Sequence, residues 1–252
     1  MYMKKETIRG LNGYDIPCLN NLSGNQRMTV IISHGFGGCK EGPTAQAVAA
    51  ALLKHGIGTY SFDFPAHGDS PVDGEQLRIS NCLNDLAAVE AHVYELMPEA
   101  EIAYFSSSFG AYINLIYLAT RPHLGKKSFL RCAAVDMPRL FRNFTSPAQY
   151  AQLDTQGSII MDYGYVRPLK VTRQFYDDLE AYDVFKLCRS DMAELALIHG
   201  DADKTAPLVD ARRFAKQFGA RLTEIQGADH CFMIPGGIEQ VIEAAVQFFS
   251  AC

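Results

Sequence analysis

The stretch IAYFSSSFGAYINLIYLA, residues 102–119, places three consecutive serines between an apolar run and a second run that is apolar on nearly all sides. A short apolar run followed by a longer one is typical of a buried strand that leads into a buried helix. We therefore predict a strand over 101–105, a turn at the serines and a helix that begins near Phe109. Serine is common at helix starts, so the turn alone is compatible with a structural cap or with a nucleophile.

Apolar runs of the same kind recur along the chain and alternate with segments of helical periodicity. Runs without a polar face are typical of strands in a parallel sheet that helices cover on both sides. The helical segments, 45–53, 79–96 and 238–249, repeat apolar residues at i, i+3, i+4 and i+7. This alternation predicts an α/β domain with a mostly parallel, doubly wound sheet. The predicted strands cover 28–33, 59–64, 101–105, 130–137, 194–199 and 221–225.

Two segments depart from this alternation. Residues 6–21 contain an Asn-Gly turn signal, which predicts an antiparallel hairpin at the edge of the sheet. Residues 138–190 contain no clear strand, and nine of the chain's 27 aromatic residues fall there. An irregular insertion of that size is often a functional lid, although an insertion packed away from any site has the same sequence pattern. We therefore predict a core of residues 1–137 and 191–252 with an inserted cap, 138–190.

The composition is that of an ordinary globular protein, with 48% hydrophobic and 20% charged residues. A net charge of -5 argues against a nucleic acid or an anionic membrane as partner. No apolar window reaches the length of a signal peptide or a membrane span. The seven scattered cysteines predict reduced thiols and neither a disulfide framework nor a zinc site. We expect a cytoplasmic protein with a small-molecule partner, and homodimer formation stays open.

The serine turn fits a known nucleophile motif in one frame. Ser106 to Gly110 matches G-x-S-x-G with Ser106 in place of the first glycine, which puts Ser108 at the nucleophile position. In that motif a sharp strand-to-helix turn exposes the serine hydroxyl, and the helix N-terminus favours negative charge beside it.

A serine nucleophile needs a histidine to accept its proton and an acid to orient the histidine. The segment LIHGDADKTAP carries Asp201 and Asp203, and IQGADHCF carries His230. Both segments follow predicted strands, where open parallel sheets place their ligand sites. His230 is the candidate base and Asp203 or Asp201 the candidate acid, with Asp136 as a further alternative. Taken singly, each of these residues is equally compatible with a turn or a helix cap.

The segment HGFGG, which follows the first predicted strand of the parallel sheet, completes the set. Acyl transfer requires two backbone N–H groups that point at the developing oxyanion, and glycines let the backbone bend to aim them. The candidate donors are the N–H groups of Phe36 and Phe109. A phosphate-binding loop is disfavoured because neither G-x-x-x-x-G-K-[ST] nor G-x-G-x-x-G is present. We expect no metal and no cofactor.

Together these motifs resemble the α/β-hydrolase fold, in particular the bacterial carboxylesterases that include cinnamoyl (feruloyl) esterases. The resemblance implies Ser108 as nucleophile, His230 as base, Asp203 as acid, and Phe36 and Phe109 as the oxyanion hole. It also implies that FDFPAHGDS is a structural turn and that residues 138–190 form a substrate-binding cap. The segments that carry the resemblance are HGFGG, FDFPAHGDS, SSSFGA, HGDAD and GADHCF.

The expected function is a serine carboxylesterase that works through an acyl-Ser108 intermediate. The aromatic cap suits an aromatic, hydroxycinnamate-type, or medium apolar acyl group. Two alternatives stay open: a serine peptidase or amidase of the same fold, and a non-catalytic protein that keeps the fold for a ligand pocket. The residues predicted to bind the substrate are Tyr150, Tyr163, Tyr165 and Phe175.

Overall fold

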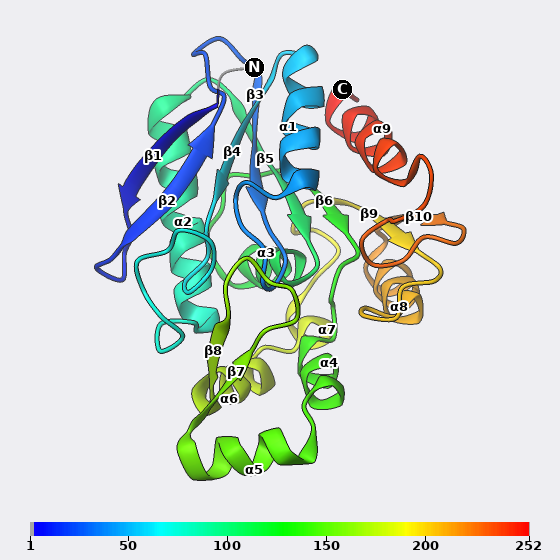
Figure 1. The fold of residues 1–252 in the computed structure, drawn as a ribbon. Helices are drawn as coiled ribbons and strands as arrows, with labels where there is room; N and C mark the ends of the chain where they lie inside the picture. The colour runs from blue at the N-terminus through cyan, green and yellow to red at the C-terminus, as the bar shows by residue number, and fades with distance from the viewer. Residues whose placement is uncertain (1–2, 252) are drawn as a thin grey trace.

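Within residues 3–251, which the computed structural model describes, an eight-stranded sheet has the order β1-β2-β4-β3-β5-β6-β9-β10. The six strands β4, β3, β5, β6, β9 and β10 pair in parallel with their neighbours in this order. Strands β1 and β2 form an antiparallel hairpin at one edge, and β2 pairs antiparallel with β4 (Figure 1). The predicted parallel sheet and the predicted hairpin are therefore both confirmed. The strands are β1 (Lys4–Arg9), β2 (Asp15–Asn20), β3 (Met28–Ser33), β4 (Ile57–Phe62), β5 (Glu101–Ser107), β6 (Lys127–Arg131), β9 (Glu194–Gly200) and β10 (Arg221–Ile225).

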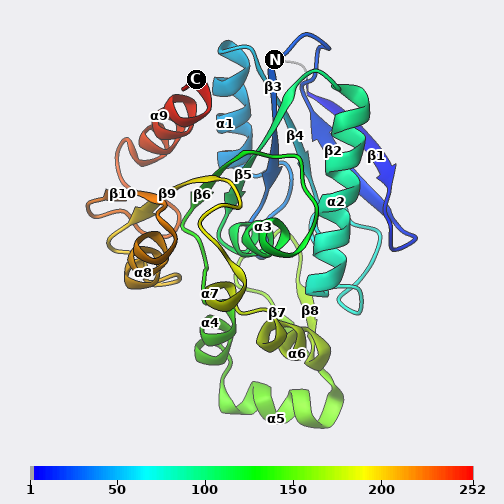
Figure 2. The same ribbon diagram turned by 180° about the vertical axis from the view of Figure 1, so that it is seen from behind.

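Helices cover both faces of the sheet, as Figures 1 and 2 show from opposite sides. The side chains of α1 and α9 form one buried core with the sheet, and those of α2, α3 and α8 form the other. Among the described residues, no helix has the length and apolar character needed to cross a membrane. The helices are α1 (Pro43–Lys54), α2 (Ile79–Leu96), α3 (Phe109–Thr120), α8 (Leu208–Phe218) and α9 (Gly237–Ser250).

The sequence predicts a strand over 130–137, but β6 ends at Arg131. Cys132 has a φ of 45°, a value that turns the chain out of the sheet. The apolar residues that follow are buried as a loop without strand pairing, because they pack into the core on the α2 and α3 face. A continuous apolar run therefore indicates burial here and not a strand. In the same way, β4 ends at Phe62, two residues before the end of its predicted range.

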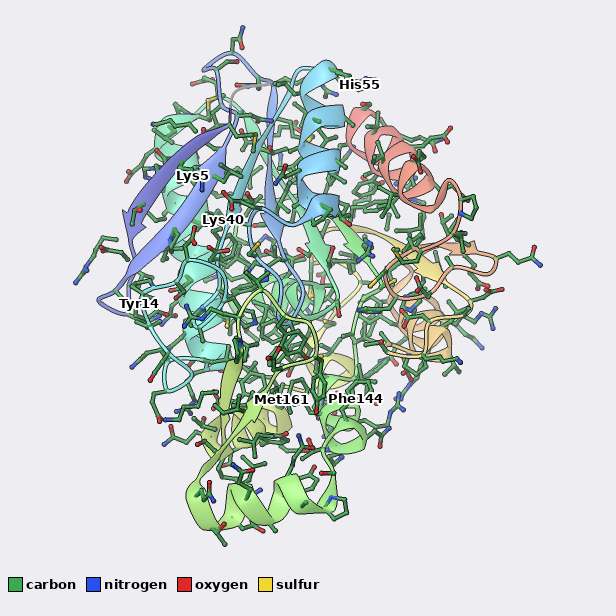
Figure 3. All side chains as sticks on the ribbon, viewed as in Figure 1. Lys5, Tyr14, Lys40, His55, Phe144 and Met161 are labelled. Carbon is green, nitrogen blue, oxygen red and sulfur yellow. The ribbon has the colours of Figure 1, made fainter. Side chains whose placement is uncertain are left out.

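The cap segment, residues 138–190, contains regular structure, so the prediction that it is irregular was wrong. Two strands, β7 and β8, pair antiparallel there. Each strand has only four residues, which is too short to show a reliable periodicity in sequence. Figure 1 shows this segment beyond the carboxyl ends of the parallel strands, and Figure 3 labels Phe144 and Met161 within it. Its elements are α4 (Met137–Phe144), α5 (Pro147–Gln156), β7 (Ser158–Met161), β8 (Leu169–Thr172), α6 (Arg173–Ala181) and α7 (Val184–Leu187).

Charged side chains attach the cap segment to the rest of the molecule. Arg78, at the start of α2, donates to both carboxylate oxygens of Asp178 on α6, at 2.7 Å each. Arg167 donates to backbone carbonyl oxygens of the 68–72 turn, the shortest of these bonds measuring 3.0 Å. A two-pronged arginine–carboxylate pair restricts orientation more than a single contact does. The cap segment is therefore held in a defined position over the sheet edge.

Candidate active site

Ser108 lies at the sharp turn between β5 and α3. Its φ of 51° and ψ of -110° belong to a region that residues other than glycine rarely adopt. The turn is fixed by its backbone, because the Ser108 N–H donates to the Arg131 carbonyl at 2.9 Å and the Ser108 carbonyl accepts from Tyr112 at 3.1 Å. The half-buried Ser108 hydroxyl therefore stands at the N-terminus of α3, in the conformation that the nucleophile motif requires.

Two small residues allow α3 to approach the sheet behind this turn. A Cβ atom at Gly110 would lie 2.6 Å from the carbonyl oxygens of both Ser33 and His34. Ser106, which replaces the first glycine of the motif, is fully buried in β5, and within residues 3–251 its hydroxyl has no hydrogen-bond partner. The first position of the motif therefore accommodates a serine, whereas Gly110 has no room for any side chain.

The Gly110→Ala variant is expected to lose about 2 to 3 kcal/mol of unfolding free energy, because the backbone of β3 must move to admit the methyl group. Ser106→Ala is the matched control, since it removes only an unpaired hydroxyl and should change stability by less than about 1 kcal/mol. Denaturant unfolding of both variants measures the difference. Equal stability of Gly110→Ala and the wild-type protein would contradict the close approach of α3.

His230 and Asp203 lie beside Ser108 on neighbouring strand-end loops. His230 Nε2 is 3.0 Å from Ser108 Oγ, and His230 Nδ1 is 2.7 Å from Asp203 Oδ2. Because an ionised carboxylate only accepts hydrogen bonds, Nδ1 carries the ring proton and Nε2 accepts from the Ser108 hydroxyl. The structure therefore brings the three side chains singled out in the sequence into one hydrogen-bonded chain.

The Asp203 carboxylate is buried and surrounded by donors. Its Oδ1 accepts from the N–H groups of Thr205 at 2.8 Å and Ala206 at 2.9 Å, and its Oδ2 lies 3.2 Å from His199 Nε2. Burial alone would raise the pKa of Asp203, but hydrogen bonds from His199 and His230 outweigh it and hold that pKa well below its usual range. Asp203 is therefore ionised at neutral pH. Sequence reasoning missed His199, although it stands in the same segment as Asp203.

The two other candidate acids have different partners. Asp201 is exposed, and its Oδ1 accepts from the Gly227 N–H at 2.6 Å. Asp136 caps the start of α4 and pairs with Arg139, with 2.9 Å between Nε and Oδ2. Among these three aspartates, Asp203 is the one that contacts the candidate base in the described part of the chain.

The loop that follows β3 lies against Ser108, because a Cβ atom at Gly35 would be 3.4 Å from the Ser108 Cβ. Within residues 3–251, neither the Phe36 N–H nor the Phe109 N–H donates to a protein acceptor. Phe109 is the first residue of α3, where helix geometry leaves the N–H without an intrahelical partner. Both amides proposed from the sequence as oxyanion donors are therefore available beside Ser108.

A buried ion pair fixes the loop that carries Phe36. Lys40 Nζ lies 2.7 Å from Asp63 Oδ2 and 2.6 Å from Asp69 Oδ2, and the Lys40 side chain is 3% exposed. Figure 3 labels Lys40. The backbone N–H of Lys40 also donates to Asp63 Oδ1, at 2.7 Å. At the other end of the loop, His34 Nε2 accepts from the Phe64 N–H at 3.2 Å. The FDFPAHGDS segment therefore supports this loop, and Lys40 is a positioning residue that sequence reasoning missed.

Aromatic rings of the cap segment pack on the ring of Phe36. The ring centroids of Phe141, Tyr165 and Phe175 lie 5.1, 5.8 and 5.9 Å from that of Phe36. Tyr165 also lies over Gly37, where any Cβ atom would collide with its ring. The cap therefore covers the loop beside Ser108 with an apolar, aromatic surface.

Of the four cap residues predicted to bind substrate, Tyr165 and Phe175 belong to this cluster, and the other two pack on other rings of the cap segment. Tyr163 is 60% exposed and packs on Tyr165, with 5.8 Å between ring centroids. Tyr150 packs on Tyr176, with 6.0 Å between centroids. Tyr165 and Phe175 therefore contact the ring of Phe36, whereas Tyr150 and Tyr163 contact other rings.

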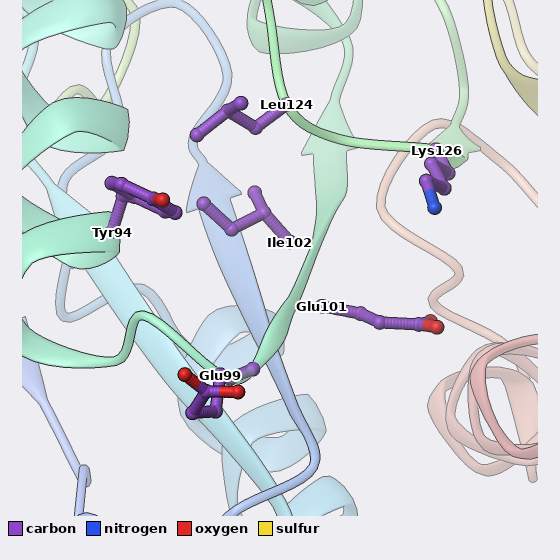
Figure 4. A pocket seen from close by; sticks show the side chains of 7 residues that line it. Tyr94, Glu99, Glu101, Ile102, Leu124 and Lys126 are labelled. Atoms are coloured by element: carbon purple, nitrogen blue, oxygen red, sulfur yellow. The ribbon is translucent and has the colours of Figure 1, made fainter.

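Two surface hollows lie at the opposite end of the sheet. One of about 230 Å³ is lined by residues that include Tyr94, Glu101 and Leu124 (Figure 4). The other, of about 560 Å³, adjoins it along 124–126. Glu101 begins β5 and Ser108 follows its end, so a strand length of roughly 23 Å separates the first hollow from the serine. These hollows are not part of the Ser108 site.

A family model described as serine aminopeptidase, S33 matches residues 24–188. The matched range includes Phe36 and Ser108 and ends before Asp203 and His230. No curated protein matches the chain.

Solved structures match nearly the whole chain. A putative hydrolase from Agrobacterium vitis S4 has a TM-score of 0.83 and 21% identity, covering 98% of this chain and 99% of its own. Est1E from Butyrivibrio proteoclasticus, with ferulic acid bound, has a TM-score of 0.82 and 21% identity, covering 96% of each chain. Alpha/beta hydrolase domain-containing protein 10 from mouse has a TM-score of 0.77 and 16% identity, covering 98% of each chain. The family match spans more than half of the chain, which therefore belongs to the serine aminopeptidase S33 family and is a hydrolase of the α/β fold.

Proposed function

We propose that this hydrolase is a serine carboxylesterase in which Ser108, His230 and Asp203 act as a catalytic triad. The observation that carries the proposal is the chain of two hydrogen bonds, 3.0 Å from Ser108 to His230 and 2.7 Å from His230 to Asp203. The strained turn at Ser108 and the two available amides beside it support the same function.

In the proposed mechanism, Ser108 Oγ attacks the ester carbonyl carbon while His230 Nε2 accepts the hydroxyl proton. The oxyanion of the tetrahedral intermediate accepts hydrogen bonds from the N–H groups of Phe36 and Phe109. His230 then gives its proton to the leaving alcohol, which leaves an acyl-Ser108 ester. Water attacks this ester with His230 again as base, and collapse of the second intermediate releases the acid and restores Ser108.

The charges of the cap segment favour an ester as substrate over a peptide that is bound by its free N-terminus. An aminopeptidase needs an anionic group to hold the substrate's ammonium. Three cap acids already pair with arginines, and Asp183 caps α7. Asp162 and Asp177, the other two, are exposed. The structure describes every residue of the cap segment. None of the acidic side chains of this segment therefore lies unpaired in the aromatic cluster around Phe36.

The proposed acyl group is aromatic, of the hydroxycinnamate type, or of medium length and apolar. The rings around Phe36 support this choice because aromatic side chains gain from offset and edge-to-face contacts with another ring. Est1E, which has the same fold, was solved with ferulic acid.

A substrate panel tests the ester proposal. Aryl acetates, butyrates and methyl hydroxycinnamates are compared with aminoacyl anilides at equal concentration, with Ser108→Ala as the background. The esters should exceed the amides by at least about 100-fold in kcat/KM, a difference of roughly 2.7 kcal/mol in barrier. Turnover of the amides alone would contradict the esterase proposal and favour the aminopeptidase activity that the family description names.

The Tyr165→Ala variant is expected to raise KM for hydroxycinnamate esters by about 5- to 20-fold, because it removes one aromatic wall beside Phe36. KM for a short acetate ester should change by less than about twofold, since a small acyl group does not reach that wall. Tyr163→Ala, which alters an exposed ring, is the matched control. Equal effects of Tyr165→Ala on both ester classes would contradict a role in acyl recognition.

A further inference from the structure

A thiol lies directly behind the proposed triad. A Cys132 Sγ, an Asp203 carboxylate oxygen and a His230 ring nitrogen all lie within 4.8 Å of one another. The three residues follow β6, β9 and β10, which are neighbouring strands, so their ligand atoms converge at one point of the carboxyl edge of the sheet. The proposed esterase mechanism uses Asp203 and His230 but gives no role to the thiol.

Cys132 is held rigidly in this position. Its side chain is fully buried, and its backbone N–H donates to the Ile198 carbonyl at 3.0 Å. The φ of 45° at Cys132 turns the chain out of the sheet at this residue. Because Asp203 is also fixed, by two backbone N–H groups on Oδ1, its Oδ2 stays directed toward the shared point. Two of the three ligand atoms are therefore preorganised.

Thiolate, imidazole and carboxylate are the ligands that Zn²⁺ takes in proteins, with bond lengths of about 2.0 to 2.3 Å. Tetrahedral coordination at those lengths puts the ligand atoms about 3.4 Å apart. The present separations, from 2.7 Å between His230 Nδ1 and Asp203 Oδ2 up to at most 4.8 Å, bracket that value. Side-chain shifts of about 1 Å would therefore let all three residues bind one cation, with water in a fourth position.

We propose that Cys132, Asp203 and His230 form an inhibitory binding site for a thiophilic divalent cation such as Zn²⁺ or Cd²⁺. The inhibitory consequence rests on the proposed esterase function, whereas the binding itself does not. His230 Nδ1 is the nitrogen that faces Asp203, so it is the ligand atom. A neutral imidazole bound through Nδ1 carries its proton on Nε2, which then cannot accept the Ser108 proton. The cation therefore locks the base in the inactive tautomer without touching the serine.

Binding of the cation changes the protonation of Cys132 and His230. Cys132 loses its thiol proton to solvent when the metal–sulfur bond forms, and Asp203 is already ionised. The His230 proton moves from Nδ1 to Nε2 through exchange with water, so one proton is released for each cation bound. A chelator reverses every step.

Access to the site is restricted, because the side chains of His230 and Asp203 are 21% and 0% exposed and Cys132 is also fully buried. Entry of the cation requires the His230 loop to open. Inhibition should therefore develop slowly after mixing and should not be instantaneous.

The test uses the chelator-treated, reduced protein with ZnCl₂ or CdCl₂. Preincubation with Zn²⁺ should lower the rate of aryl ester hydrolysis by at least about 100-fold, in line with the cost of the wrong histidine tautomer, and EDTA should restore it. Titration with Cd²⁺ should produce the ultraviolet charge-transfer band of a cadmium–thiolate bond, saturating at one cation per chain.

Two cysteine variants make the test specific. For each variant, the rate with Zn²⁺ is divided by its own rate without Zn²⁺. Cys132→Ser should remove both the inhibition and the cadmium band, whereas Cys231→Ser, which changes the exposed thiol beside His230, should keep both. Cys132→Ala serves as a second variant if the serine destabilises the protein. Inhibition and a cadmium band that persist in the Cys132 variants, or no band in the wild-type protein, would overturn the proposal.

The Ser108→Ala variant separates this proposal from the proposed function. It should bind Cd²⁺ with the same band and stoichiometry, because Ser108 is not a ligand. A wild-type protein that shows the cadmium–thiolate band but hydrolyses no ester would refute the esterase proposal and would still support the metal site.

Discussion

The Ser108→Ala variant is expected to lose at least about four orders of magnitude in kcat toward an aryl ester, because alanine cannot form the acyl intermediate. KM should change little, since the cap aromatics and the two amides proposed as oxyanion donors remain. The loss amounts to roughly 5.4 kcal/mol of transition-state stabilisation. Steady-state kinetics with the purified variant measure it, and circular dichroism checks that the fold is intact.

The two neighbouring serines provide matched controls for this prediction. Ser106 is fully buried in β5, and the Ser107 side chain follows it on the same strand, whereas only Ser108 of the three contacts His230 in residues 3–251. Ser106→Ala and Ser107→Ala should therefore keep kcat within about tenfold of the wild-type value. Near-normal turnover by Ser108→Ala would show that the serine is not the nucleophile.

The Asp203→Asn variant is expected to lose about three to four orders of magnitude in kcat. Its amide oxygen must take the place of Oδ1, where two backbone N–H groups donate at 2.8 and 2.9 Å. The amide NH₂ then faces His230 Nδ1, which has to accept, so the ring proton moves to Nε2. In that tautomer His230 cannot take the proton of Ser108.

Asp201→Asn is the control for the acid assignment, because the Asp201 carboxylate accepts from the exposed Gly227 N–H, an interaction that an asparagine oxygen can also make. Its kcat should stay within about threefold of wild type. Kinetics of the two variants at the same pH decide the assignment. Similar, mild losses in both would mean that the acid lies elsewhere.

Motif order allowed the central part of the site to be predicted from sequence. Ser108 and the pair Asp201 and Asp203 each follow a buried strand, and His230 follows the exposed edge strand β10. Parallel strands bring such ends to one edge of the sheet. The choice between the two aspartates came from the resemblance, because both follow the same strand. The structure separates them through the direction of each side chain, which depends on contacts with distant loops.

Local sequence patterns do not identify Lys40 and His199 as positioning residues. Lys40 reads in sequence as a surface lysine, and its burial depends on Asp63, 23 residues further along the chain. His199 has the apolar neighbours of a core strand and approaches Asp203 only once the turn after β9 has formed. Strands β7 and β8 were missed because each is short and gains its stability from the other. All three features depend on contacts that form only when the chain folds.

Labelling with a serine-directed fluorophosphonate, followed by mass spectrometry of the modified peptide, shows directly whether Ser108 is an activated nucleophile. The reagent bonds covalently only to a serine that a neighbouring base activates, so a protein that keeps the fold merely to bind ligands would not react. The expected result is one adduct per chain on Ser108, absent in His230→Ala. No adduct on the folded protein, or an adduct on a serine other than Ser108, would contradict the proposed site.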